Sequence, residues 1–239
     1  MAHRRPFYTE LLAFLVLHPS GVTADQISEA FGIQPERARK DIGIVRGWLG
    51  TDARTGKLHL PNARQTHTAG EGAKYAVNGV ATDLDLFRRL RGRGQSRGTA
   101  GIDDLQSALT FVTGEPFSDL RPTGWSWLLD GERSDHIMAC AIADTAHIVA
   151  THALAVGDLD LARFAAETGC LALPYDDTSR LDLVAVEKAS GHDEVADGFL
   201  AEGIVNRSDD DAGPVDVPSH TSRVIRQRSW TSSRSRSAG

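Results

Sequence analysis

The sequence predicts a mainly α-helical protein in two folded parts with a disordered C-terminal tail. Apolar residues recur at helical spacing through most of the chain. Two short segments with alternating apolar residues follow the first three helical stretches, and a 34-residue internal repeat marks the second half. We therefore expect a first domain over residues 1–82, a helical repeat domain over 83–205 and a tail over 206–239.

The charges of the 239-residue chain divide unevenly along it. Apolar residues make up 41% and charged residues 24%, which excludes collagen-like and wholly disordered chains. Residues 1–98 hold 15 Lys and Arg against 9 Asp and Glu, a net charge of +6, whereas residues 99–205 hold 5 against 19, a net charge of −14. A basic first part beside an acidic second part indicates an anionic partner for the first part alone.

Three helices are expected within residues 6–49. The first carries an apolar stripe and ends before a Pro-Ser-Gly turn. The second begins after Thr23, whose hydroxyl and the Gln26 side chain can form a capping box. Gly32 can then leave that helix in a left-handed conformation, and a proline suits the first turn of the third helix, residues 35–49.

Beyond residue 50 the apolar period changes from 3.6 to 2. Residues 58–60 and 75–77 each alternate as short strands, and a polar segment with several glycines joins them. Three helices followed by a hairpin are the order of a winged helix-turn-helix domain, in which the polar segment is the wing. Arg64 and Lys74 lie on this predicted wing, where they could reach phosphate or the minor groove.

The third helix is the predicted DNA-recognition helix. Its inner face is apolar, and Gly43 and Gly47 on its outer face tolerate close approach of a partner. Arginine pairs with guanine in the major groove and lysine neutralises phosphate. The cations on or beside the outer face are therefore the predicted DNA contacts: Arg37, Arg39, Lys40 and Arg46. The alternative is that they form only a solvated helix face.

The second half contains the internal repeat. Residues 155–162 and 189–196 align at an offset of 34, the tetratricopeptide period, and in each a helix ends at glycine before an acidic turn. Two unrelated helix-Gly-helix turns are the alternative. The aromatic segment 125–127 is interpreted as a hydrophobic plug where the repeat helices begin, or otherwise as a partner surface. Residues 206–239 lose apolar periodicity, and Trp230 is expected to be exposed.

Residue patterns for catalysis are absent from the sequence. It contains no phosphate-binding loop, dinucleotide fingerprint, HExxH or GxSxG motif. His147 and His152 are five residues apart, whereas four would place both over one metal ion. Adjacent aspartates are interpreted as helix starts and solvated charge. We therefore predict no enzyme, no metal site and no cofactor.

The cysteines and the apolar runs indicate a cytoplasmic protein. Cys140 and Cys170 form no ligand spacing, and Cys140 is expected in the core. The longest apolar run, residues 11–17, is too short for a membrane helix, so no membrane partner is predicted for this chain. A secretory signal is the weaker interpretation of the N-terminus, because Pro6 and Glu10 interrupt it.

The order of these features resembles actinobacterial transcriptional regulators of the SARP type, in which an OmpR-like winged helix precedes a bacterial transcriptional activator domain of tetratricopeptide-like helices. The resemblance covers residues 6–205 and depends on order along the chain: YTELLAFLVLHP at 8–19, Gly21-Val22, Gln26-Ile27, Ala38-Arg39, Val45-Arg46, Leu49-Gly50, Tyr75, DLDLF at 83–87, Leu105 to Leu109 and TGEPF at 113–117.

This resemblance implies binding to promoter double-stranded DNA, often at direct repeats, and activation through contact with RNA polymerase. A homodimer is also compatible with it. A similar pair of domains ends larger actinobacterial proteins with membrane segments and a LysM module, so the chain could be a fragment of such a protein. The rival hypothesis is an interaction scaffold that binds no DNA, with acidic repeats that bind a basic partner.

Overall fold

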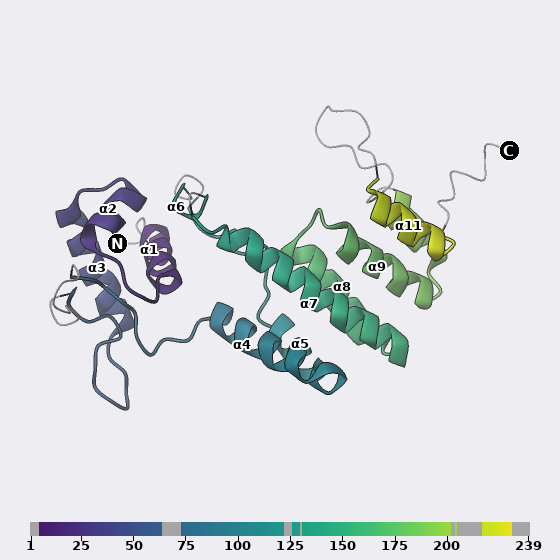
Figure 1. Ribbon diagram of the computed structural model, residues 1–239, viewed down its shortest axis with the longest axis horizontal. Helices are drawn as coiled ribbons and strands as arrows, with labels where there is room; N and C mark the ends of the chain where they lie inside the picture. The colour runs from purple at the N-terminus through teal and green to yellow at the C-terminus, as the bar shows by residue number, and fades with distance from the viewer. Residues whose placement is uncertain are drawn as a thin grey trace. The chain divides into compact units, whose positions relative to one another are not determined.

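The computed structural model describes residues 5–63, 73–121, 126–129, 131–201, 204 and 217–230 (Figure 1). The described chain is mainly α-helical, which confirms the predicted class. It divides into two compact units, one of Met1–Thr82 with Phe117–Ser134 and the other of Asp83–Pro116 with Asp135–Gly239. We call these the first and second units and describe each by itself.

The first unit is built on α1 (Arg5–Leu17), α2 (Ala24–Phe31) and α3 (Pro35–Leu49). Thr23 Oγ1 accepts a hydrogen bond from the Gln26 amide and the Gln26 side chain accepts one from the Thr23 amide, so the predicted capping box is confirmed. Gly32 ends α2 with φ +60°, and α3 has the predicted bounds. Side chains of all three helices share one apolar core, formed around Leu11, Leu15, Ile27, Ile42 and Val45.

The two segments predicted to pair as a hairpin have other partners in the structure. Leu58 forms an isolated antiparallel bridge with Thr51, and Tyr75 forms one with Val22, so the described residues contain no strand pairing of 58–60 with 75–77. His59 still contacts the second segment, because its Nδ1 lies 2.8 Å from the carbonyl oxygen of Asn78. Short segments that find partners elsewhere satisfy their backbone groups without a two-stranded ladder. The intervening residues 64–72 lie outside the described chain.

Residues 117–134 belong to the first unit, not to the predicted helical domain. Trp127, in the short helix α6 (Ser126–Leu129), packs against Phe14 and Phe31, with ring centroids 5.1 and 6.2 Å away. Its Nε1 donates to Glu10 Oε1 at 2.9 Å, and Arg121 Nε donates to Glu10 Oε2 at 2.5 Å. Trp127 therefore packs on α1 and α2, whereas the sequence placed the aromatic segment at the start of the repeat helices; residue 125 lies outside the described chain.

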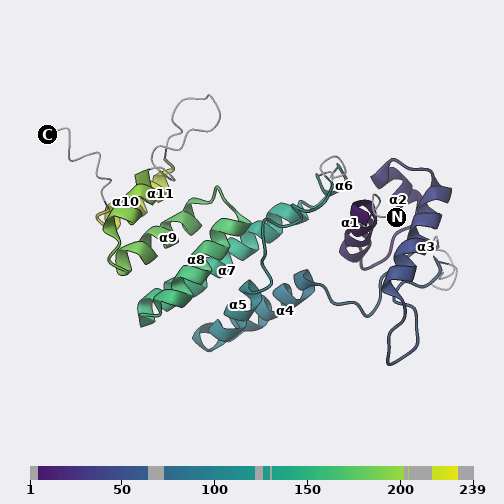
Figure 2. The ribbon, with the colours of Figure 1, turned by 180° about the vertical axis from the view of Figure 1, so that it is seen from behind.

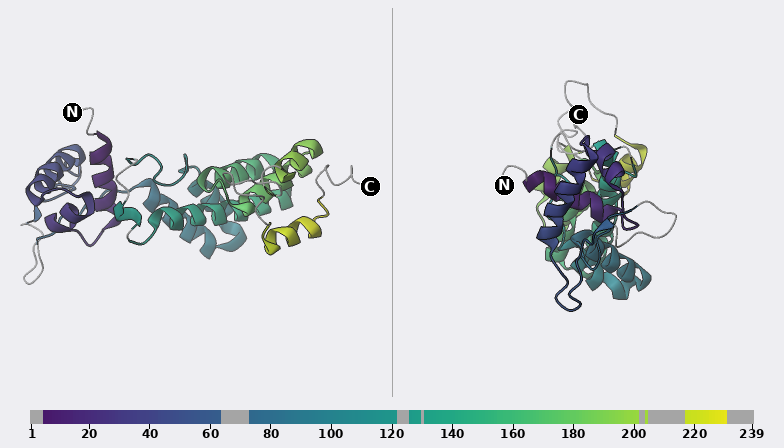
Figure 3. Two further views of the ribbon diagram at one scale, coloured as in Figure 1. Left: turned by 90° about the horizontal axis from the view of Figure 1, so that it is seen from above. Right: turned by 90° about the vertical axis from the view of Figure 1, so that its left-hand side faces the viewer.

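The second unit consists of helices that pack side by side (Figures 2 and 3). Its elements are α4 (Asp83–Ser96), the 3-10 helix η3 (Gly98–Gly101), α5 (Ile102–Leu109), α7 (Ser134–Val156), α8 (Leu159–Ala172), α9 (Asp177–Ala189), α10 (Asp193–Leu200) and α11 (Ser219–Gln227). Gly169 lies where three of them meet: a Cβ there would be 3.1 Å from the Cβ atoms of Ala146 in α7 and Ser179 in α9.

The two aligned turns of the predicted repeat have matching geometry. Gly157 after α7 and Gly191 after α9 have φ angles of +81° and +78°. The amide of the following residue donates to the carbonyl four residues before each glycine, at 2.9 Å in both turns. Ala162 and Ala196, which align in the next helices, are both completely buried. A left-handed glycine and a buried alanine thus allow the same helix reversal twice.

The C-terminal tail contains a helix that the sequence did not predict. Helix α11 packs Val224 and Ile225 on the apolar cluster of α9 and α10, and Trp230 is half-buried on the same cluster. The predictions of disorder over 217–230 and of an exposed Trp230 are therefore wrong. This segment has few apolar residues, and their contacts lie on other helices, so packing on α9 and α10 stabilises the helix more than its own sequence does.

Helix α7 requires two further corrections. It is long and apolar enough, by length and composition, to cross a membrane, although half of its most apolar window is buried inside the unit. A core helix passes the same test, and α7 buries Met138, Ile142 and Val149. Cys140, which was expected in the core, is exposed, with Sγ 3.6 Å from His136 Nε2.

Candidate nucleic-acid interface

Helix α3 is anchored by its inner face. Ala38, Ile42 and Val45 are completely buried in the core of the first unit. Their spacing of four and three residues places them on one side of the helix. The opposite side of α3 is thereby held toward solvent, and any ligand of the helix would have to contact that side.

Arg39 and Lys40 are the exposed cations of this outer side. Neither side chain has a hydrogen bond or an ion pair within the part of the chain that the structure describes. Glu36 is also exposed there, so the described outer side has a net positive charge. Unpaired cations on a rigid helix can exchange their water for phosphate or base-edge oxygens without breaking an internal contact.

Two glycines open the same side of the helix. A Cβ atom built at Gly43 or Gly47 would have no neighbour within 4 Å. The helix backbone is therefore accessible to a partner between Lys40 and the C-terminal end of α3. Because alanine would stabilise an exposed helix position by roughly 1 kcal/mol relative to glycine, this surface is locally suboptimal for folding.

Arg37 has a structural partner. Its Nε donates to Asp41 Oδ2 at 2.9 Å, and Asp41 is completely buried. The hydroxyl of Tyr8 donates to the other carboxylate oxygen at 3.4 Å. Burial and the adjacent carboxylate raise the pKa of Tyr8, so that the hydroxyl remains a donor. Arg37 thus compensates a buried charge and is less available to DNA than the sequence predicts.

Arg46 is also used internally. Its Nε donates to the carbonyl oxygen of Leu60 at 2.7 Å, and its Nη2 donates to that of Pro61 at 3.3 Å. These bonds fix the segment after the 51–58 turn onto α3. Arg46 was predicted to face the groove, and in the structure its guanidinium is bonded to backbone oxygens fourteen and fifteen residues away.

The predicted wing residues are only partly described. Arg64 lies outside the described residues. Lys74 is half-buried and has an interaction within the protein, so it is not a free cation. Of the six predicted DNA contacts, the described structure thus leaves Arg39 and Lys40 exposed on one surface.

The turn that follows α3 carries two cations that the sequence analysis missed. Asp52 Oδ1 accepts the amides of Arg54 at 2.9 Å and Thr55 at 2.7 Å, and the Thr55 bond is the largest cause that lowers the pKa of Asp52. Arg54 and Lys57 are exposed on this turn, and within the described chain their side chains have no ion pair. The Asp-x-x-Thr-Gly pattern is a turn signal that could have located them.

Metal-ligating side chains do not gather in the described chain. Among those residues no three His, Cys, Asp or Glu side chains form a group that could hold a metal ion. His147, one of the two histidines considered from the sequence, is instead bonded to Asp182. In comparisons with known proteins, no family model, no curated protein and no solved structure matches the chain.

Proposed function

We propose that the protein is a DNA-binding transcriptional regulator whose helix α3 contacts the major groove of duplex DNA. The observation that carries this proposal is the pair Arg39 and Lys40, exposed and unpaired within the described chain, on a helix whose opposite side is buried. Arg39 can donate two parallel hydrogen bonds to guanine, and Lys40 can neutralise phosphate.

The open glycines support the same proposal. A DNA backbone or base edge can approach a helix closely only where no side chain intervenes, and Gly43 and Gly47 lie beside Lys40 on the outer side of α3. Arg54 and Lys57 extend the positive surface beyond the C-terminal end of the helix. We assign them to phosphate contacts, because they sit on a turn and not on an element that could enter a groove.

The proposal also includes a fold type for each of the two units. We infer a reduced winged helix-turn-helix from α1, α2 and α3 with the bridges Thr51–Leu58 and Val22–Tyr75, although a full wing would need strands. The second unit is inferred to be tetratricopeptide-like from its two matching glycine turns. In this interpretation the second unit supplies contacts to RNA polymerase or to a second copy of the chain.

Fluorescence anisotropy with a labelled random duplex tests the proposal. We compare the full chain with the double variant Arg39→Gln/Lys40→Gln at two salt concentrations. The variant should lose about tenfold or more in affinity, and the slope of log K against log salt should fall by about 1, because Lys40 is the phosphate contact that is removed. A full chain whose DNA affinity does not depend on salt would contradict the proposal.

A matched control separates site contacts from net charge. The double variant Arg88→Gln/Arg89→Gln removes the same charge from the exposed side of α4. Its affinity should stay within about twofold of the parent, because these two cations are not part of the proposed α3 surface and salt screens a charge that makes no contact. Equal losses in the two double variants would assign the binding to overall charge and reject α3 as the contact element.

A scaffold function is the second candidate, and one observation favours it. The second unit exposes large apolar side chains in a strongly acidic region, among them Leu171, Tyr175, Val195 and Phe199. Exposed apolar side chains on an acidic surface could bind a basic, amphipathic protein segment through apolar contacts and opposite charge. A chain that binds no DNA in the titration above but retains a basic peptide would favour this function.

A further inference from the structure

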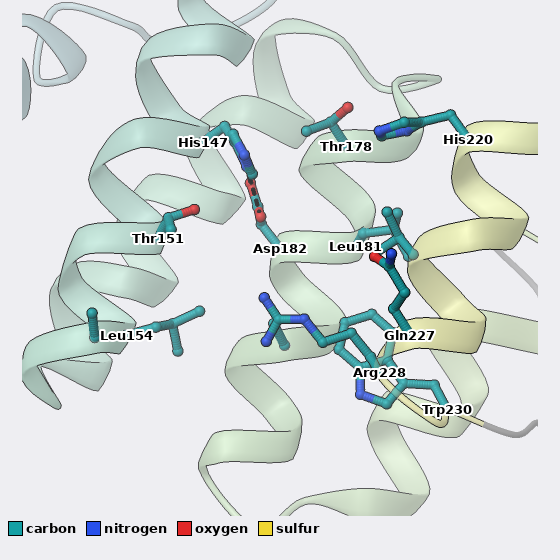
Figure 4. Close-up of a pocket in the computed structure, with 13 residues that line it drawn as sticks. His147, Thr151, Leu154, Thr178, Leu181, Asp182, His220, Gln227, Arg228 and Trp230 are labelled. Carbon is teal, nitrogen blue, oxygen red and sulfur yellow. Dashed lines mark hydrogen bonds and ion pairs between the residues drawn. The ribbon is translucent and has the colours of Figure 1, made fainter.

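The second unit contains a cavity between α7, α9 and the C-terminal segment. Its volume is about 510 Å³, in the range of small-molecule sites. Three parts of the chain line it: His147, Thr151 and Leu154 from α7, Thr178, Leu181 and Asp182 from α9, and the segment from His220 to Trp230 (Figure 4). The unpredicted helix α11 thus forms one wall of the cavity.

The carboxylate in this cavity already has a partner. His147 Nδ1 lies 2.9 and 2.8 Å from the two oxygens of Asp182. The hydrogen bond to Asp182 raises the pKa of His147, so the imidazole holds its proton more readily than usual. The pair therefore presents little free negative charge to a ligand.

Arg228 is a further cation of this cavity, and its charge acts on Asp182 without a hydrogen bond or ion pair to it. Its guanidinium lies 5.9 Å from the centroid of the Trp230 ring and points from the end of α11 toward the space between α7 and α9 (Figure 4). Within the described chain its guanidinium has no ion pair or hydrogen bond. An arginine whose guanidinium donors are unused within the described chain can bind an external anion.

The remaining lining supplies an apolar and a polar side. The apolar side consists of the half-buried indole of Trp230 and the side chains of Leu154, Leu181 and Val224. The hydroxyls of Thr151 and Thr178 and the amide of Gln227 lie among them. Such a lining suits a molecule with a planar apolar body and one charged end.

We propose that this cavity binds a small aromatic carboxylic acid, with its carboxylate at Arg228 and its ring against Trp230 and Leu181. The bound acid would join α11 to α7 and α9 and thereby stabilise the C-terminal helix on the second unit. The proposal is independent of DNA binding, since every residue that carries it belongs to the second unit.

Calorimetric titration of the full chain with 2-naphthoate tests the proposal. 2-Naphthamide has the same ring system without the charge. We expect saturable binding of one naphthoate per chain and at least about tenfold weaker binding of the amide, since charge-assisted hydrogen bonds are roughly twice as strong as neutral ones. No binding of naphthoate, or equal binding of the two compounds, overturns the proposal.

Two single variants on neighbouring positions locate the site. Arg228→Gln should weaken naphthoate binding about tenfold or more, whereas Arg226→Gln, an exposed position of α11 outside the cavity lining, should change it less than about twofold. Circular dichroism checks that both variants retain the parent helix content. Unchanged binding in Arg228→Gln, or the same loss in both variants, would place the ligand elsewhere and overturn the assignment.

The DNA surface serves as a second control. Arg39→Gln/Lys40→Gln should bind naphthoate as the parent does, because those cations belong to the first unit. If this variant loses naphthoate binding, the anion binds at α3 and not in the cavity, which overturns the proposal while leaving the DNA titration to be judged separately.

Discussion

The two units differ in the size of the side chains at their helix contacts. The first unit fills its interior with rings: Phe14 contacts Phe31 edge to face at 5.4 Å and Trp127 at 5.1 Å, and Phe7 lies 5.6 Å from Phe31. The second unit brings its helices together through small residues, with Ala146, Ala150, Ala153, Ala162, Ala165, Ala166 and Gly169 between α7, α8 and α9. The first core thus contains a cluster of aromatic rings, whereas small residues lie at the contacts between α7, α8 and α9 of the second unit.

This difference teaches that the same change in side-chain size has opposite consequences in the two units. Truncation of an aromatic residue leaves a cavity, whose cost adds to the lost transfer free energy. Addition of a methyl group where backbones already touch forces the helices apart. The change in the free energy of unfolding on truncating or enlarging a side chain therefore shows whether large or small residues fill that contact.

The largest expected effect is a cavity in the first unit. Phe14→Ala should lower the free energy of unfolding by about 3–5 kcal/mol, because it removes contacts with Phe31 and Trp127 together. Urea unfolding monitored by tryptophan fluorescence measures this loss. Ala150→Gly in α7 is the matched truncation in the second unit and should cost only about 2 kcal/mol for one methyl and helix propensity. Equal losses would contradict the contrast between the cores.

A buried charge in the first unit comes next. Arg121→Ala leaves the completely buried carboxylate of Glu10 with the Trp127 indole as its described partner and should destabilise the protein by about 3 kcal/mol. Denaturant unfolding of Arg121→Ala, of Glu10→Gln and of the double variant Glu10→Gln/Arg121→Ala gives the coupling. The double variant should lose less than the sum of its single changes, and strict additivity would show that the pair does not interact.

The opposite change, addition of a methyl group, is tested in the second unit. A Cβ at Gly101 would lie 2.1 Å from the carbonyl oxygen of Gly94, so Gly101→Ala should destabilise by about 1–3 kcal/mol. Gly92 is on the same helix as Gly94 but has nothing within 4 Å of a built Cβ, so Gly92→Ala should stabilise by up to roughly 1 kcal/mol. Thermal unfolding followed by far-ultraviolet circular dichroism compares them, and two variants with the same sign would refute the argument.

A smaller change links stability to the proposed function. Gly47→Ala should stabilise α3 by about 0.5–1 kcal/mol, because the new methyl group meets open space. If DNA approaches the backbone of α3 there, the same variant should bind duplex more weakly by severalfold. Unfolding and anisotropy measurements on one preparation check both effects. A stabilised variant with parent DNA affinity would place the DNA contact away from Gly47.

The smallest predicted effect is an acid dependence of the second unit. Glu187 accepts a hydrogen bond from Arg163 Nη1 and has His192 Nδ1 2.8 Å away. The Arg163 bond is the main cause that lowers the pKa of Glu187 below the ordinary glutamate value of 4.5. The stabilisation is therefore fully present above that value and is lost as the pH falls through the lower folded pKa. Urea midpoints at about pH 7 and 3.5 should differ less in Glu187→Gln than in the parent. An identical acid loss would assign it to other carboxylates.

The sequence predicted some features closely because they depend on near neighbours. The capping box of Thr23 and Gln26, the extent of α3 and the positive φ of Gly32 all arise within one helix or one turn. The exposure of Arg39 and Lys40 follows from the same periodicity that buries Ile42 and Val45. Residue spacing alone thus predicted correctly that two of the four candidate cations of the helix are exposed to solvent.

Other features depend on a distant partner, which residue spacing does not reveal. Arg46 satisfies carbonyl oxygens at residues 60 and 61, and Lys74 has an interaction within the protein. The predicted strand 58–60 pairs at Leu58 with the neighbouring Thr51, not with 75–77. A cation on the outside of a helical wheel is free only if no backbone oxygen comes within reach, and residue spacing does not encode that proximity.

The sequence by itself determined the three helices of the first unit, the cap of α2 and the separation of basic and acidic parts, because each is a property of residues near one another in the chain. Only the tertiary structure decided that Glu10 meets partners at 121 and 127, that Gly169 sits between three helices, and that α11 closes a cavity on α7 and α9. These features depend on contacts between residues far apart in the chain. Their free energy comes from burial and pairing that exist only after the helices have packed.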